Sequence, residues 1–347
     1  MMRARPGRRR PPARPGALVA ALGLLISAGC AGRPGGDATA PAAAPSTTAV
    51  VPYVDVSLGP TPLVEMARAT GVTDVVLAFA LATDGACTPS WGGTRSLTDP
   101  GLLAEIDALR GRGGRVAVAT GGADGPYLET TCATSGEPAA AYGALLDATG
   151  STHLDVDVEA SIPTGTVVQS LRRLQDARGT DITLTLRVTG PQAGLEAPAL
   201  DLVRAADAAG LRFGVNAMVM NFPFRDSWAR AMTDAVDATS GQLRALRPAP
   251  GPSGVAPSLG ITLMIGRTDT GPVTTLADAR AVAAAASARG LRDVRFWSLA
   301  RDNGNCPGAA AATFDCSGVE QAPFAFTETV RDAVRAPAAH QHTQDGS

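Results

Sequence analysis

Three acidic side chains alternate with apolar ones in the run Leu154-Asp155-Val156-Asp157-Val158-Glu159. Alternate residues of a β-strand point to the same face, so the three carboxyls line one side while the apolar side chains pack on the other. Desolvation and mutual repulsion favour the neutral form of at least one of these acids. A protonated carboxylic acid beside an ionised one can do the general acid–base work that cleavage of a glycosidic bond needs.

The elements that must position these acids follow a regular order along the chain. From Val50 onward, apolar β-branched runs alternate with alanine- and arginine-rich helical patterns. Strands are predicted over residues 51–56, 74–80, 115–120, 153–159, 181–188, 213–220, 259–265 and 293–298. Helices are predicted over residues 62–71, 99–112, 137–149, 164–178, 198–209, 226–247, 276–289 and 321–335. Near-continuous apolar strands separated by helices indicate a parallel sheet that is covered on both faces.

Eight such βα units in about 290 residues predict an α/β protein with a single-domain TIM (β/α)8 barrel over residues 50–336. An open doubly wound sheet fits less well, because no Gly-x-Gly-x-x-Gly run follows the first predicted strand. In a TIM barrel the chemistry lies at the carboxyl ends of the strands. Gly121, Glu159, Asn221 and Trp297 stand at such ends. We therefore expect them to lie at the same mouth of the barrel.

Residues 1–29 have the composition of a signal peptide. Six arginines precede the apolar run Ala17–Ile26, which is too short to span a bilayer. The run Ser27-Ala28-Gly29-Cys30 resembles a bacterial lipobox, in which the cysteine is lipidated, and ordinary secretion with Cys30 as a spare thiol is the alternative. The composition of residues 30–49 predicts a flexible Ala/Pro-rich tether, and residues 337–347 are expected to form a disordered tail.

Removal of the first 29 residues would take away six arginines and change the net charge from −2 to −8. An acidic mature protein disfavours nucleic acid and anionic membrane surfaces as partners. We therefore expect an exported monomer that is secreted or lies on the outer face of the cell membrane. A lipid anchor at Cys30 would be its sole contact with the membrane.

Four further cysteines indicate disulfide bonds, because their number is even, an exported protein is oxidised and their spacings fit no metal motif. Four cysteines allow three pairings, and the loop positions favour Cys87–Cys132 and Cys306–Cys316. His153 is the one histidine outside the tail, which excludes His-based triads and His-rich zinc sites. We expect neither a metal nor a cofactor.

Residues 152–159 resemble the D-G-x-D-x-D-x-E signature of family 18 glycoside hydrolases, the chitinases and their relatives. Three further segments resemble motifs of that family in the same order: Asn216–Asn221, Thr262–Gly266 with Asp269, and Phe296–Asp302. The resemblance extends over about residues 50 to 330, essentially the whole predicted barrel.

Four positions depart from the family pattern. Thr152 and His153 replace the first Asp and the Gly of the signature, and Ala119 replaces a Ser on the third strand. Met220 stands where many members have a Tyr. Such changes could weaken the stabilisation of a reaction intermediate.

The resemblance implies a mechanism in which the acetamido group of the substrate is the nucleophile. Glu159 would protonate the glycosidic oxygen and then activate water. Asp157 would hold the acetamido N–H, and Asp155 would lie deeper and hold Asp157 by a hydrogen bond or a shared proton. Asn221 would hydrogen-bond the acetamido group, and Trp297 would form an apolar floor under the sugar.

Further residues are candidates for the substrate-binding wall: Met218, Met220, Gly121, Tyr53 and Phe79. For Tyr53 and Phe79, packing in the core is the competing interpretation, and the two methionines fit core or pocket equally well. Trp91 could stack on a sugar or anchor its loop.

The leading hypothesis is a chitinase-like glycosidase that cleaves β-1,4-linked N-acetylglucosamine oligosaccharides with retention of configuration. The alternative is a glycan-binding lipoprotein that kept the barrel and lost the activity, which the four departures and an aromatic content of 4% favour. A third possibility is hydrolysis of another acetamido glycan. A short oligosaccharide or a soluble polysaccharide is the expected partner.

Overall fold

The computed structural model describes residues 48–246 and 258–336. The predicted signal peptide, the lipidation site Cys30, most of the predicted tether and the predicted tail lie outside the described residues.

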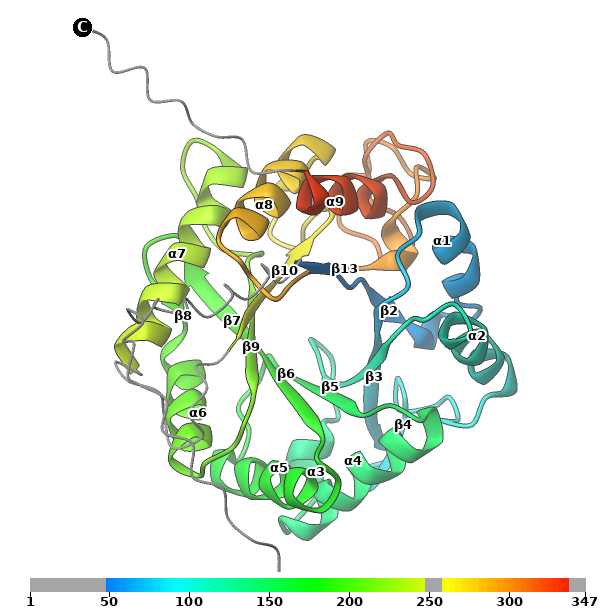
Figure 1. The fold of residues 1–347 in the computed structure, drawn as a ribbon, viewed down its shortest axis with the longest axis vertical. Helices are drawn as coiled ribbons and strands as arrows, with labels where there is room; N and C mark the ends of the chain where they lie inside the picture. The colour runs from blue at the N-terminus through cyan, green and yellow to red at the C-terminus, as the bar shows by residue number, and fades with distance from the viewer. Residues whose placement is uncertain (1–47, 247–257, 337–347) are drawn as a thin grey trace, which may run out of the picture. The chain divides into compact units, whose positions relative to one another are not determined.

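Parallel strands form the centre of the described region, and helices surround them (Figure 1). The strands of this ring are β1 (Ala49–Val50), β2 (Tyr53–Asp55), β3 (Val75–Thr83), β5 (Val116–Gly121), β6 (His153–Val158), β7 (Asp181–Gly190), β9 (Gly214–Met218), β10 (Leu259–Met264) and β13 (Asp293–Trp297). Neighbours follow the order β1-β13-β10-β9-β7-β6-β5-β3-β2. The predicted TIM barrel is confirmed, with β1 and β2 as the two halves of its first strand.

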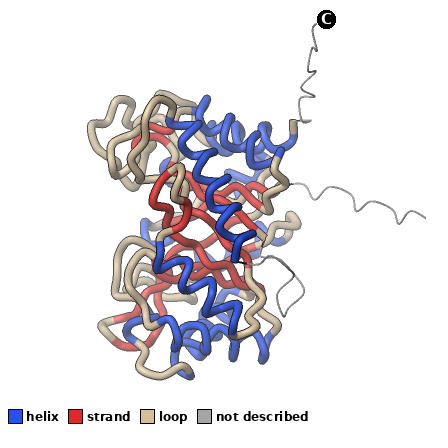
Figure 2. Tube along the Cα trace, turned by 90° about the vertical axis from the view of Figure 1, so that its left-hand side faces the viewer, coloured by secondary structure: helices blue, strands red, loops and turns tan. Residues whose placement is uncertain are grey.

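With β1 and β2 counted as one strand, each barrel strand is followed by a helix that covers the outside of the barrel, as Figure 2 shows with helices in blue around strands in red. These helices are α1 (Leu63–Thr70), α2 (Pro100–Arg110), α4 (Gly136–Thr149), α5 (Thr164–Arg178), α6 (Ala197–Ala208), α7 (Trp228–Leu246), α8 (Leu276–Ala288) and α9 (Ala325–Arg335). Within the two described ranges, no helix is long and apolar enough to cross a membrane.

The first strand is divided because Pro52 has no backbone N–H to donate to a neighbouring strand. β1 pairs with β13, and β2 pairs with β3. The carbonyl of Pro52 still accepts a hydrogen bond of 3.0 Å from the N–H of Val76. The barrel therefore closes through both halves, and its first strand begins at Ala49, two residues before the predicted start.

Alternation along β6 divides its side chains between two environments. Leu154 and Val156 are buried against the helices in the main hydrophobic core, and Val158 packs at its edge. Asp155 and Asp157 point into the barrel, where both are buried. Full burial of one such aliphatic side chain contributes about 1.5–3 kcal/mol, so the outward face of β6 fixes which way its acids point.

Local capping fixes where several helices begin. Asp99 accepts a hydrogen bond of 2.9 Å from the N–H of Leu102 and precedes Pro100 in the first turn of α2. Thr275 and Asp278 form a reciprocal capping box at the start of α8. The predicted start of the last helix, at residue 321, is wrong. Phe324 has a left-handed backbone with φ 62°, so α9 begins at Ala325.

Short elements that the sequence pattern did not reveal extend the carboxyl end of the barrel. They are β4 (Ala86–Trp91), α3 (Leu128–Thr131), β8 (Gly194–Leu195), β11 (Gly266–Arg267) and β12 (Val273–Thr274). β4 folds back on β3 as an antiparallel hairpin. Trp91 is fully buried on β4, so it anchors this hairpin and is not a sugar platform.

Both predicted disulfides are confirmed. Cys87–Cys132 joins β4 to the end of α3, with 4.9 Å between Cα atoms. Cys306–Cys316 closes part of the loop between β13 and α9, with 6.0 Å between Cα atoms.

Candidate active site

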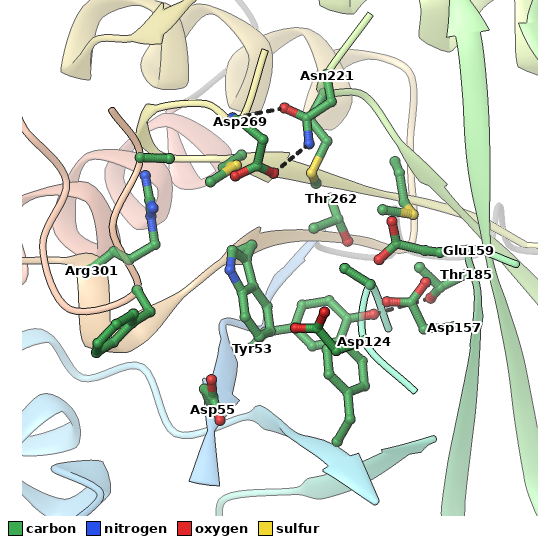
Figure 3. A pocket seen from close by; sticks show the side chains of 18 of the residues that line it. Tyr53, Asp55, Asp124, Asp157, Glu159, Thr185, Asn221, Thr262, Asp269 and Arg301 are labelled. Carbon is green, nitrogen blue, oxygen red and sulfur yellow. Dashed lines mark hydrogen bonds between the residues drawn. The ribbon is translucent and has the colours of Figure 1, made fainter. Parts of the chain in front are cut away.

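A cavity of about 510 Å³ opens at the carboxyl ends of the barrel strands (Figure 3). Eight of the ten residues predicted for catalysis or substrate binding line it: Tyr53, Phe79, Asp157, Glu159, Met218, Met220, Asn221 and Trp297. Asp155 and Gly121 do not line the cavity. The barrel thus brings these eight side chains together from five of its strands and the loops that follow them.

Asp155 is fully buried beneath the cavity and is held by three partners. Its carboxylate accepts hydrogen bonds from the Tyr53 hydroxyl at 2.5 Å and the Thr185 hydroxyl at 2.7 Å. Arg295 completes the set with an ion pair of 3.0 Å. These contacts occupy the Asp155 carboxylate, and the expected shared proton or hydrogen bond between Asp155 and Asp157 stays a prediction. A guanidinium inside the barrel balances the buried charge.

Asp157 lies directly above, and only 4% of its surface is exposed. Its Oδ1 atom is buried and has no hydrogen-bond partner. Burial raises the pKa of Asp157 well above its usual range, the charges of Glu159 and Asp155 raise it further, and Arg295 opposes the rise. The site therefore holds a carboxyl that loses its proton at a higher pH than an ordinary aspartate, and a buried acceptor oxygen without a donor.

Glu159 follows the last residue of β6 and faces the cavity. Burial raises the pKa of its carboxyl; the charge of Arg187 works against this rise, whereas nearby acids, Asp269 first, add to it. The Arg187 guanidinium also donates a hydrogen bond of 3.3 Å to the Glu159 backbone carbonyl. A carboxyl with a raised pKa is suited to general acid catalysis near neutral pH.

Three aromatic rings form one wall of the cavity. Phe79 and Trp297 are stacked, with ring centroids 5.4 Å apart and planes 16° apart. The Tyr53 ring lies 6.0 Å from Phe79 and 6.1 Å from Trp297. Tyr53 is nevertheless buried, and its hydroxyl serves Asp155, so this residue belongs to both the core and the cavity wall.

Asn221 and Asp269 form a reciprocal pair on the opposite wall (Figure 3). The Asn221 amide nitrogen donates to the Asp269 carboxylate at 2.8 Å, and the Asp269 N–H donates to the Asn221 amide oxygen at 3.2 Å. One of the two amide hydrogens of Asn221 remains available to a substrate.

Gly121 acts on the site through the backbone. It has φ +86°, and a Cβ atom there would lie 1.8 Å from the carbonyl oxygen of Asp157. Glycine therefore lets β5 approach β6 just below the acids. Met218 and Met220 cluster with Met264 beside the ring of Trp297 and line the cavity.

The four departures from the family pattern have different locations. Thr152 and His153 lie at the amino end of β6, where His153 Nε2 hydrogen-bonds the Thr183 hydroxyl at 2.8 Å. Ala119 is buried among the apolar residues inside the barrel. Met220 is the one of the four that lines the cavity.

Several residues of the site were missed from the sequence. Thr185, Asp124 and Phe314 line the cavity, and Arg295 neutralises Asp155. A signal for Arg295 was present, because Asp293, Arg295 and Trp297 alternate along β13 and must share its inward face.

The comparisons agree with this arrangement. No protein-family model matches the chain. The chain is 30% identical over 304 residues to "Probable bifunctional chitinase/lysozyme" of Escherichia coli (strain K12). This match covers 80% of the chain and 33% of the length of that protein. It is 28% identical over 275 residues to "Endochitinase 11" of Metarhizium anisopliae, covering 72% of the chain and 52% of that protein. The chain thus spans a third to a half of the length of these relatives.

Among solved structures, the catalytic domain of a hyperthermophilic chitinase from Pyrococcus furiosus superposes with a TM-score of 0.76 at 29% identity. The match covers 84% of the chain and 97% of that domain. Catalytic-site mutants of active domain 2 of a Pyrococcus furiosus chitinase, complexed with chito-oligosaccharides, match with a TM-score of 0.75 at 29% identity, covering 83% of the chain and 94% of that structure. The chain is thus similar in fold and in sequence to the catalytic domains of chitinases.

Proposed function

We propose that the chain hydrolyses glycosidic bonds of β-1,4-linked N-acetylglucosamine oligosaccharides, with the acetamido group of the substrate as the nucleophile and retention of configuration. The observation that carries this proposal is the pair formed by Asp157 and Glu159. Both carboxyls have raised pKa values, and both face a cavity that has an aromatic wall. The chitinase relatives support the same substrate class.

Each acid has a distinct task in this proposal. Glu159 donates its proton to the leaving glycosidic oxygen and later accepts a proton from the attacking water. The unpartnered Oδ1 of Asp157 accepts the acetamido N–H, which orients the acetamido oxygen for attack. Asp155 does not touch the substrate, and its ion pair with Arg295 keeps the buried site electrically balanced.

The geometry also supports one direction for the bound chain. A second hollow of about 220 Å³ shares Glu159, Met220 and Asn221 with the main cavity and adds Arg187. The sugar that reacts would lie against Trp297, and the departing sugar would lie beyond Glu159, in this second hollow. The opposite end of the main cavity is then left for sugars on the non-reducing side.

A glycan-binding protein without activity is the second candidate, and Met220 is the observation that favours it. Three of the four departures lie away from the cavity wall, whereas Met220 lies on it. Binding of an acetamido oligosaccharide without any cleavage would establish this alternative. Cleavage of another acetamido glycan remains compatible with the same pair of acids.

The first prediction concerns Glu159. Glu159→Gln keeps the shape of the side chain and removes the transferable proton, so turnover of a chromogenic chito-oligosaccharide should fall at least about 100-fold. Glu328→Gln, an exposed site on α9, is the matched control and should keep the wild-type rate. A wild-type protein that turns over no acetamido sugar, or a Glu159→Gln variant of full activity, would overturn the proposal.

We also propose that the domain acts outside the cytoplasm, secreted or held by a lipid at Cys30. The two disulfides support this location, because such bonds persist in oxidising compartments. Mass spectrometry of the protein from its own cells would decide between a free and a lipidated Cys30.

A further inference from the structure

The loop between β13 and α9 supplies one wall of the cavity. Ala312, Thr313 and Phe314 of this loop all line it. The Phe314 side chain is 63% exposed, the largest fraction for a bulky apolar residue in the described part of the chain, where Leu58 follows with 41%. An apolar ring exposed on a cavity wall is a surface that a ligand can cover favourably.

The segment that carries Phe314 is fixed on both sides. Cys306–Cys316 closes the loop, and the Thr313 hydroxyl donates a hydrogen bond of 3.1 Å to the carbonyl of Cys316. The Asn303 amide donates to the carbonyl of Asp315 at 2.8 Å. Phe314 is therefore presented to the cavity by neighbours that are themselves held in place.

Arg301 ties this loop to the barrel. Its guanidinium is buried and hydrogen-bonds the carbonyl of Thr313, and it also donates to the carbonyl of Ile265 at 2.9 Å. Figure 3 shows Arg301 and Glu159 on opposite sides of the cavity. The loop wall is thus at the end remote from the proposed acid, where sugars on the non-reducing side would lie.

We propose that Phe314 is a sugar-stacking residue at this remote end, and that the Cys306–Cys316 loop holds it there, so that the enzyme prefers longer acetamido oligosaccharides. This inference rests on the proposed function. A pyranose ring presents a face of C–H groups, and its contact with an aromatic ring removes apolar surface of both from water. A short substrate that occupies only the sites near Glu159 does not reach Phe314.

The test compares kcat/KM for a six-sugar N-acetylglucosamine chain with kcat/KM for a chromogenic disaccharide glycoside. Phe314→Ala should lower the ratio of the two about tenfold, the change that partial burial of a phenylalanine side chain provides. Phe314→Trp, which keeps an aromatic face, should retain the ratio. A Cys306→Ser/Cys316→Ser variant should lower it as Phe314→Ala does, because the loop loses its closure.

Phe224→Ala is the matched control. Phe224 is 38% exposed, packs on Trp228 with ring centroids 4.9 Å apart and does not line the cavity. This variant should leave the ratio unchanged.

The outcomes separate the two proposals. If the wild type cleaves the disaccharide glycoside and Phe314→Ala keeps the wild-type ratio, stacking is refuted and the proposed function stands. If the wild type cleaves neither substrate, the proposed function fails. Calorimetry of the six-sugar chain then decides on stacking, with about tenfold weaker binding to Phe314→Ala expected and equal binding contradicting it.

Discussion

At the scale of single residues, three acids on one strand face are tolerated because each has a different environment. Asp155 is paired with Arg295, burial and neighbouring acids raise the pKa of Asp157, and Glu159 lies at the cavity. The alternation along β6 was sufficient to predict that these acids share a face. Their partner could not be predicted from spacing, since Arg295 is 140 positions from Asp155 and only closure of the barrel brings the two together.

The raised pKa of Asp157 predicts a pH-dependent cost in stability. The pKa of Asp157 is higher in the folded protein than in the unfolded protein. The protonated carboxyl therefore contributes its full share to the free energy of unfolding at pH values below the usual carboxyl pKa, and this share is lost as the pH rises toward the pKa of Asp157 in the folded protein. Asp157→Asn removes this titration. The variant should gain in melting temperature over the wild type as pH rises from 4 to 8, the window that begins at about the ordinary carboxyl pKa.

Thermal unfolding at several pH values measures this difference. Glu328→Gln, at an exposed position, serves as the control and should run parallel to the wild type. A melting-temperature difference between Asp157→Asn and the wild type that stays constant with pH would contradict the assignment of a raised pKa to this carboxyl.

At the scale of elements, the long periodic segments were predictable and the short ones were not. The eight barrel helices and their strands were found because each buries a continuous apolar face. α3 and β8 are too short for a period to show, and β4, with the sequence ACTPSW, contains a proline and lacks a continuous apolar run. Tertiary contacts decide the structure of all three. Pro52 interrupts the first strand in a way that its sequence signals, yet the prediction carried one unbroken strand through it, from residue 51 to residue 56.

Asp302 belongs to this scale, because it docks a whole helix. Its carboxylate accepts hydrogen bonds from the N–H groups of Phe326 at 2.9 Å and Thr327 at 2.8 Å, at the start of α9. The Arg-Asp end of the eighth-strand motif is thus structural: Arg301 holds the neighbouring loop, and Asp302 holds the helix.

Asp302→Ala should therefore destabilise the protein by about 2–4 kcal/mol, because buried N–H groups lose charged acceptors. Urea unfolding gives the total, and hydrogen exchange should show the loss of protection concentrated in α9. Asp332→Ala, an exposed acid on the same helix that pairs with Arg331, should cost about 0–1 kcal/mol. Equal losses for the two variants would show that Asp302 does not dock the helix.

At the scale of the whole molecule, the residues that shape the cavity lie at the carboxyl ends of the barrel strands, and a different set of residues lies at the amino ends of the strands. Thr152 and His153, which depart from the family signature, lie at the amino end of β6, whereas Glu159 follows its carboxyl end. In the sequence these residues precede Asp155 by only three and two positions, and the structure shows that this short spacing along the strand separates them from the cavity. Closure of the barrel also places the loop between β13 and α9, near the end of the described chain, across the cavity from Glu159. No local pattern in the sequence predicts this arrangement.

The central claim is that this cavity cleaves acetamido sugars with the help of the substrate's own acetamido group. Mass spectrometry of products from matched N-acetylated and fully deacetylated β-1,4-linked chains tests it most directly. The wild type should shorten the acetylated chain and leave the deacetylated chain intact, and Glu159→Gln should shorten neither. Equal cleavage of both chains would contradict the role of the acetamido group, and an intact acetylated chain would contradict the claim itself.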